Sequence, residues 1–168
     1  MDAHGLITHG LALALALCMV VVIISDAAHY IIPNWLNGLV ALLFVGGAVA
    51  GVADPVSGLM AAGALLALGL VLFTLGLMGG GDVKLLVVCA LWTGFGRLTV
   101  EFIFLTSVMG GALVILTLML RKIIPPIWLR LAHAHALPRL LTRGEAVPYG
   151  IAIAAAFLWL LARGAIVT

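Results

Sequence analysis

The chain has 168 residues, of which 65% are hydrophobic and only 8% are charged, with a mean hydropathy of +1.36. Water-soluble domains usually carry about 25% charged residues, so this composition excludes a water-soluble globular protein. The formal net charge of +2 is too small to indicate a nucleic-acid partner. The long apolar runs favour membrane-spanning helices over a barrel, whose strands alternate in polarity.

The apolar runs predict an all-α membrane protein with about six spans, because each span needs about 20 apolar residues. The predicted spans are residues 6–25, 35–52, 56–77, 83–97, 100–120 and 148–163. The fourth is the shortest charge-free run, and it crosses only if Lys84 and Arg97 extend their charged ends to the interface. Residues 1–168 are predicted to form a single transmembrane domain.

One loop, residues 121–147, holds five of the eight Lys and Arg residues. These residues are Arg121, Lys122, Arg130, Arg139 and Arg143. The positive-inside rule predicts that this loop is cytoplasmic. Counting spans back from it places Asp26 and Asp82 on the cytoplasmic side and Asp54 on the opposite side. Asp26 and Asp82 share a side even if the fourth span does not cross, because two full spans separate them.

Asp26 and Asp82 are the first candidates for chemistry. Acidic side chains at a membrane boundary are costly unless they are paired or hydrated, so they are functional candidates by default. Each could instead be a helix cap at the interface, and the helix dipole would favour Asp82 at the start of a helix. Gly79, Gly80 and Gly81 precede Asp82, and their backbone can take positive φ and let another chain approach closely.

Two further polar patches are predicted on the same side. Pro33 prevents the first helix from continuing, and Asn34 is predicted to cap the second span. Pro148, Tyr149 and Gly150 open the last span. Tyr149 could hydrogen-bond within a polar site, or it could be an ordinary tyrosine of the membrane interface.

No metal and no cofactor is expected. Cys18 and Cys89 lie in separate apolar runs, with no cysteine or histidine near them at metal-ligand spacing. His133 and His135 form an H-x-H in the loop, but no third ligand accompanies them.

These motifs together resemble those of the type IV prepilin peptidase family, the GxGD membrane aspartic proteases. That family has an Asp shortly before Ile-Pro-Asn and a GxGD motif that opens a later helix, here Asp26 before Ile32 and Asp82 after Gly81. A Pro-Tyr-Gly near the last helix recurs in its small members. The resemblance implies that Asp26 and Asp82 are catalytic. It implies substrate-binding or supporting roles for Gly79, Gly80, Gly81, Lys84, Pro33, Asn34, Pro148, Tyr149 and Gly150.

The resemblance also implies a function and a location. The chain would be an aspartic endopeptidase of the prokaryotic inner membrane that cleaves prepilin precursors at the cytoplasmic face. Its substrate would carry a short basic leader before a hydrophobic helix. The chain resembles the short members that process Flp/Tad-type pilins. It has no C-x-x-C motif of the kind that the large members carry, so N-methylation of the cleaved pilin is not expected.

The chemistry of the residues agrees with such an enzyme, and two alternatives stay open. Two nearby carboxylates share a proton, so one can accept a proton from water while the other donates to the scissile carbonyl. Lys84 lies two residues from Asp82, so it faces elsewhere, towards lipid phosphate or Glu145. The alternatives are a small proton- or ion-coupled transporter, which would transport without cleaving peptides, and a non-enzymatic subunit of a pilus or secretion machine, which would tolerate replacement of either Asp.

Overall fold

The computed structural model describes residues 3–123 and 147–167, and these residues form helices and connecting turns without strands. The helices are α1 (Ala3–His29), α2 (Asn34–Val49), α3 (Pro55–Thr74), α4 (Gly80–Thr93), α5 (Arg97–Ile123) and α7 (Tyr149–Ala162). The predicted all-α fold is therefore confirmed, and each predicted span overlaps one helix. Most of the predicted basic loop lies outside the described residues.

Three of these helices are long and apolar enough to cross a membrane, over His4–His29, Pro55–Thr74 and Arg97–Leu120. Two others, α2 and α7, are shorter apolar helices. The boundaries predicted for the fourth span were wrong. That helix, α4, has 14 residues and ends at Thr93, before Gly94, which has a φ of 64°. At 1.5 Å per residue α4 is about 21 Å long, shorter than the roughly 30 Å hydrocarbon core.

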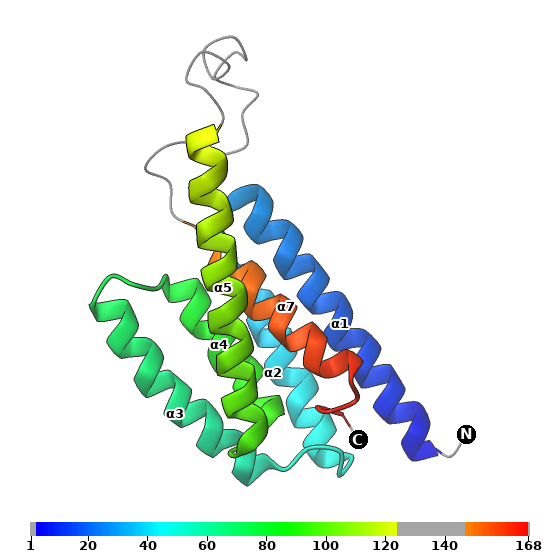
Figure 1. Ribbon diagram of the computed structural model, residues 1–168. Coiled ribbons are helices and arrows are strands. Elements are labelled where there is room, and N and C mark those ends of the chain that lie inside the picture. Colours follow the sequence, from blue (N-terminus) through cyan, green and yellow to red (C-terminus); the bar gives the residue numbers. More distant parts are fainter. Residues whose placement is uncertain (1–2, 124–146, 168) are drawn as a thin grey trace.

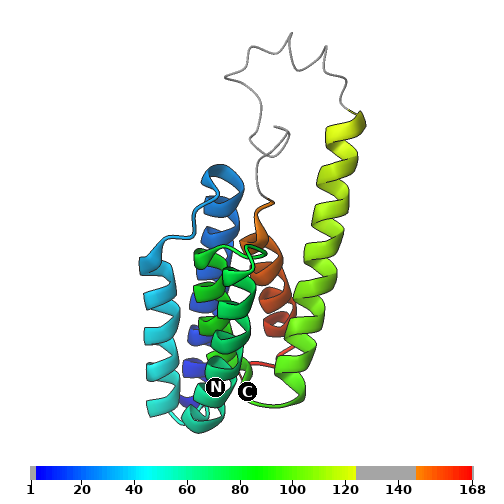
Figure 2. The same ribbon diagram turned by 90° about the vertical axis from the view of Figure 1, so that its left-hand side faces the viewer.

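The helices alternate in direction along the chain, as Figure 1 shows. The chain ends marked N and C lie at one end of the bundle, together with the connections from α2 to α3 and from α4 to α5. The other end carries the end of α1, the starts of α4 and α7, and the end of α5 (Figures 1 and 2). This alternation agrees with the predicted placement of Asp26 and Asp82 at one end and Asp54 at the other.

The core forms around α7 and α4. The helix α7 contacts α1, α4 and α5, and its buried face includes one glycine and three alanines, small residues that let neighbouring backbones approach closely. The Phe157 ring of α7 meets Phe102 of α5 edge-on, with 6.2 Å between ring centres. On α4, Trp92 donates a hydrogen bond of 3.2 Å to the carbonyl of Val40 in α2. These contacts join α7 to α5 and α4 to α2, and α7 also packs against α1 and α4.

Candidate active site

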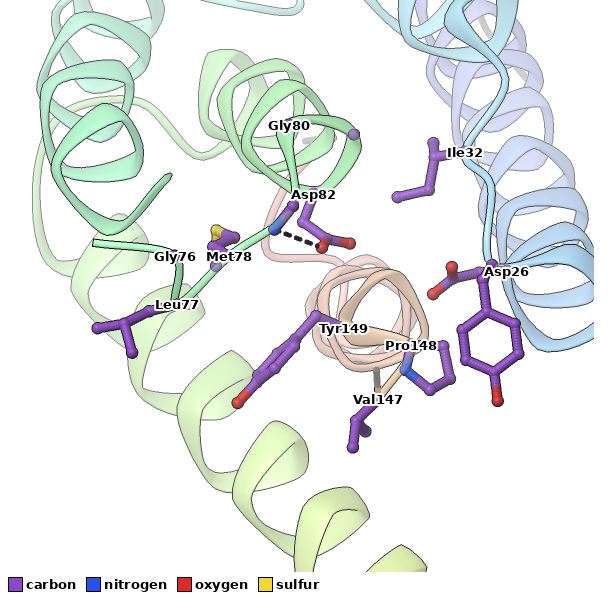
Figure 3. Close-up of a pocket in the computed structure, with 13 residues that line it drawn as sticks. Asp26, Ile32, Gly76, Leu77, Met78, Gly80, Asp82, Val147, Pro148 and Tyr149 are labelled. Atoms are coloured by element: carbon purple, nitrogen blue, oxygen red, sulfur yellow. Dashed lines mark hydrogen bonds between the residues drawn. The ribbon is translucent and has the colours of Figure 1, made fainter. Parts of the chain in front are cut away.

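A cavity of about 490 Å³ opens where α1 ends and where α4 and α7 begin. Its lining comes from three stretches that are distant in sequence: the end of α1 with the turn after it, the linker before α4 with the first turn of α4, and the start of α7. The lining residues are Asp26, Tyr30, Ile32, Gly76–Asp82 and Val147–Tyr149. Figure 3 shows the carboxyl groups of Asp26 and Asp82 pointing towards one another across the first turn of α7. We call this the aspartate cavity.

Asp26 lies in the last turn of α1 and is only 4% exposed. Its position is explained by the neighbouring helix. The residue before α7 is Pro148, which provides no side-chain cap for the helix. Asp26 supplies one instead, because its Oδ2 accepts a hydrogen bond of 3.2 Å from the backbone N–H of Ile151. The positive end of the α7 dipole also favours a carboxylate at this place.

Asp82 lies in the first turn of α4, where its Oδ2 accepts a hydrogen bond of 3.2 Å from the backbone N–H of Gly79 (Figure 3). Asp82 therefore does cap the start of its own helix, as the helix-cap interpretation predicted. That interpretation leaves the direction of the carboxyl group unexplained, because capping its own helix does not require Asp82 to face Asp26. Both roles are compatible, since a carboxylate can accept several hydrogen bonds.

Gly150 separates the two carboxyl groups, and its backbone amide acts on both of them. A Cβ atom at this position would lie 2.7 Å from Oδ2 of Asp26 and 2.7 Å from Cδ1 of Ile32. Real Cβ atoms essentially never approach other atoms so closely, so any side chain here would displace Asp26. The close packing of Asp26 and Ile32 therefore explains why position 150 of the predicted site is a glycine.

The electrostatics of the cavity disfavour two negative charges. Burial, together with the negative charge of Asp26, raises the pKa of Asp82 to about 6, against the opposing effect of the N–H groups of Gly79 and Gly150. Within the described residues, the ion pair that occurs joins Arg163 to Glu101 and involves neither aspartate. With no cation paired to either carboxyl there, the pair is suited to hold one proton between its members.

The three glycines before Asp82 do not behave alike. None of them uses the positive φ that glycine allows; the left-handed turn of this linker is at Gly76, with a φ of 70°. A Cβ at Gly79 would lie 2.9 Å from Oδ2 of Asp82, whereas one at Gly80 or Gly81 would meet its nearest neighbour at 3.5 or 3.6 Å. Gly79 is therefore needed by the carboxyl group itself, and the other two leave a bare surface towards the cavity.

Three of the predicted supporting residues lie outside the aspartate cavity. Pro33 is the residue before α2, and Asn34 is the first residue of that helix and does not cap it, so the predicted cap was wrong. The amide of Asn34 is occupied by Lys84, whose Nζ donates a hydrogen bond of 2.9 Å to Oδ1. Lys84 faces away from the aspartates, as its spacing from Asp82 predicted. Its other suggested partner, Glu145, lies outside the described residues.

Pro148 and Tyr149 do line the cavity. The Tyr149 ring extends away from the carboxyl groups, and it packs on α5 where a Cβ at Gly110 would be 3.2 Å from Cε1 of the ring (Figure 3). The sequence reasoning missed Tyr30, which directly follows α1, has a φ of 58° and also lines the cavity. No sequence signal marks a tyrosine for a conformation that usually selects glycine or asparagine.

A metal-dependent chemistry has no obvious ligand set in this region. Across residues 3–123 and 147–167, no group of three or more His, Cys, Asp or Glu side chains could hold a metal ion. The chemistry that the arrangement does offer is proton transfer between water, a substrate and two carboxyl groups. This is the pattern of general acid–base catalysis by a carboxylate pair.

The family model of the type IV leader peptidases matches residues 13–115, a range that includes both aspartates and the glycines before Asp82. The chain belongs to the type IV leader peptidase family. This confirms the family that the motifs predicted, and it assigns the protein to membrane peptidases that process prepilin-type precursors. No curated protein and no solved structure gives a significant match.

Proposed function

We propose that Asp26 and Asp82 are the catalytic pair of an aspartic endopeptidase that removes the leader of prepilin precursors at the cytoplasmic face of the inner membrane. One observation carries this proposal: two carboxyl groups from separate helices face each other in a single cavity. Membership of the leader peptidase family supplies the reaction class. The basic loop, residues 121–147, supports the cytoplasmic orientation through the positive-inside rule.

The reaction follows from a pair that holds one proton. The ionised carboxylate removes a proton from a water molecule while the water oxygen attacks the carbonyl carbon of the scissile peptide. The protonated carboxyl gives its proton to the carbonyl oxygen, and a tetrahedral diol forms. When the C–N bond breaks, the nitrogen takes a proton from one carboxyl and the other recovers one from the diol. The pair ends as it began, with one proton.

The surroundings of the pair support a particular class of substrate. The bare surface of Gly80 and Gly81 leaves room for an extended peptide backbone beside Asp82. The cavity lies at the end of the bundle, so a peptide bond just outside a membrane-embedded hydrophobic helix would reach it. The short basic leader before that helix would then lie in the headgroup region on the same side. The whole chain, 1–168, acts as one peptidase domain in this proposal.

The test is cleavage of a pilin-type precursor by the purified protein in detergent. We expect one cut, at the junction of the basic leader and the hydrophobic helix, with both products identified by mass. A second precursor, in which the hydrophobic helix is replaced by a polar sequence of equal length, should be cleaved poorly because its junction is no longer held at the membrane edge. Cleavage of neither precursor, or equal cleavage of both, would contradict the proposed substrate class.

A further inference from the structure

A second cavity, of about 310 Å³, lies between α2, α3 and α4 and is separate from the aspartate cavity. Most of the side chains around it are apolar, and the polar exceptions come from α2 and the first turns of α4. The lining residues are Asn34, Asn37, Gly38, Ala41, Leu66, Val83, Lys84, Val87 and Val88. We call it the α2–α4 groove. Its volume is at the lower end of the range of small-molecule sites in proteins.

Asn37 is the unusual residue of this groove. It is only 6% exposed, and neither its amide nitrogen nor its amide oxygen has a hydrogen-bond partner. Buried side-chain amides in folded proteins nearly always have partners, so an unpaired one needs an explanation. Because Asn37 lines the groove, a molecule bound there would be positioned to pair with it. Such a molecule must offer polar atoms next to an otherwise apolar surface.

Lys84 indicates that the bound molecule carries a negative charge. Its side chain is exposed at the mouth of the groove, and its Nζ is hydrogen-bonded to the neutral amide of Asn34 at 2.9 Å. In the part of the chain that the structure describes, no carboxylate lies within ion-pair distance of it. A cation with a neutral partner can still accept an anion, and three N–H donors leave two for it.

The groove has an order along the membrane normal. Asn34 and Lys84 lie in the first turns of α2 and α4, which both begin at the end of the bundle that carries the aspartate cavity. Asn37 lies one turn deeper along α2. The apolar Ala41 and Val87 lie deeper still. Charge at the edge, a polar amide below it and then hydrocarbon is the order of groups in a phospholipid that stands in one leaflet.

We infer that the α2–α4 groove binds one anionic glycerophospholipid from that leaflet. Its phosphate is held by Lys84, its glycerol and ester region pairs with Asn37, and an acyl chain lies against Ala41, Leu66 and Val87. Leu66 is 44% exposed, so the apolar part of the groove is open to the bilayer. The bound lipid would pack beside Val83, next to Asp82, and would steady the start of α4. The inference does not depend on which residues cleave the substrate.

The experiment measures lipid retention and thermal stability of the full-length protein in neutral detergent. Phosphatidylglycerol is the probe, and phosphatidylcholine with the same acyl chains is the control. We expect native mass spectrometry to find one retained phosphatidylglycerol, bound on the order of fivefold more tightly than phosphatidylcholine, which is the contribution of about one lysine. We also expect phosphatidylglycerol to raise the melting temperature. Equal retention of both lipids would overturn the inferred preference for an anionic lipid.

Two matched glycines of α2 test the place of binding. A Cβ at Gly38 or at Gly46 would meet nothing within 4 Å, so both positions accept a larger residue, but only Gly38 lines the groove. Gly38→Phe should abolish retention, and Gly46→Phe should not. Asn37→Leu should stabilise the lipid-free protein and reduce the stabilisation by phosphatidylglycerol. Equal retention by the two glycine variants would overturn the inference, as would selective cross-linking of a precursor helix to position 38 without lipid binding.

Discussion

Both ends of the bundle carry an aspartate at the start of a helix, and the two aspartates have different surroundings. Asp54 precedes α3, where its Oδ1 accepts hydrogen bonds from the N–H groups of Val56 at 3.0 Å and Ser57 at 3.4 Å. It is exposed and serves its own helix. Asp82, in the first turn of α4, accepts one N–H from its own helix and faces a second carboxyl group across a cavity.

The difference shows what separates a structural carboxylate from a candidate catalytic one. The position of each aspartate on its own helix does not separate the two, because both lie where an acid stabilises a helix start. The separating feature is a second element that approaches with a like charge. At the Asp82 end, α1 brings Asp26 and α7 brings the N–H groups that hold it. Such an arrangement raises the electrostatic cost of the folded state, and functional sites are where such costs are retained.

The largest expected effect comes from removing one carboxyl group at a time. Asp26→Asn and Asp82→Asn should each lower precursor cleavage by about 10²- to 10⁴-fold, because an amide cannot exchange the protons that general acid–base catalysis needs. Both variants should fold, since the amide oxygen of Asn can still accept the N–H of Ile151 or of Gly79. The measurement is the rate of precursor conversion on a gel, with circular dichroism in detergent to verify folding.

The matched control is Asp54→Asn at the other end of the bundle, which should cleave at the wild-type rate. The double variant of Asp26 and Asp82 should be no slower than either single variant, because the two residues act as one unit. Near wild-type cleavage by either single variant would exclude the aspartyl mechanism. An equal loss in Asp54→Asn would instead indicate a general effect of acid removal.

A second, smaller effect is expected from a methyl group. Gly150→Ala places a Cβ where Asp26 and Ile32 already are, so the carboxyl group must move, and a displacement of this kind can cost about 10²-fold in rate. Gly111→Ala on α5 is the control, because a Cβ there meets nothing within 4 Å. It should leave cleavage unchanged and add up to about 1 kcal/mol of helix stability.

The value of this comparison is that both changes add the same atom to a helix. If Gly150→Ala cleaves as fast as Gly111→Ala, the close approach of α7 to Asp26 has no part in the reaction. A loss of cleavage with an unchanged melting temperature would indicate that the methyl group disturbs the carboxyl pair and leaves the fold intact.

A smaller effect is expected on the pH dependence of cleavage, which should follow from Asp82 at one end of the bundle and be independent of Asp54 at the other. The pKa of Asp82 is raised to about 6, so its protonated form persists to that pH and is lost above it. The pair then carries two negative charges and no proton to donate. We expect kcat/KM to fall about tenfold per pH unit on the alkaline side, and to fall again in acid when both carboxyl groups are protonated. Asp54→Asn should show the same pH profile as the wild type. A wild-type rate independent of pH between about pH 5 and 8 would contradict the prediction.

The sequence predicted the helices well because their apolar runs are long, and it predicted the shared end of Asp26 and Asp82 because span parity depends only on counting. It could not predict that Asp26 caps α7, since a proline before a helix does not say which distant side chain replaces the missing cap. Nor could it predict the pairing of Asn34 with Lys84, two residues 50 positions apart. Contacts between helices depend on packing, which leaves no periodic signal in the sequence.

The smallest expected effect concerns Asp54 itself and completes the comparison. Asp54→Ala removes the side-chain acceptor for the N–H groups of Val56 and Ser57, and losing such a cap typically costs about 1 kcal/mol. Asp54→Asn keeps an acceptor oxygen, and asparagine is among the best capping residues, so its cost should be close to zero. We therefore expect Asp54→Ala to lower the melting temperature in detergent by a few degrees and Asp54→Asn to leave it unchanged. Neither variant should change precursor cleavage at a temperature where both are folded.

If Asp54→Asn destabilised the protein as much as Asp54→Ala, the charge of Asp54 would matter and its hydrogen bonds would not. That result would remove the distinction between a capping aspartate at one end and a site aspartate at the other.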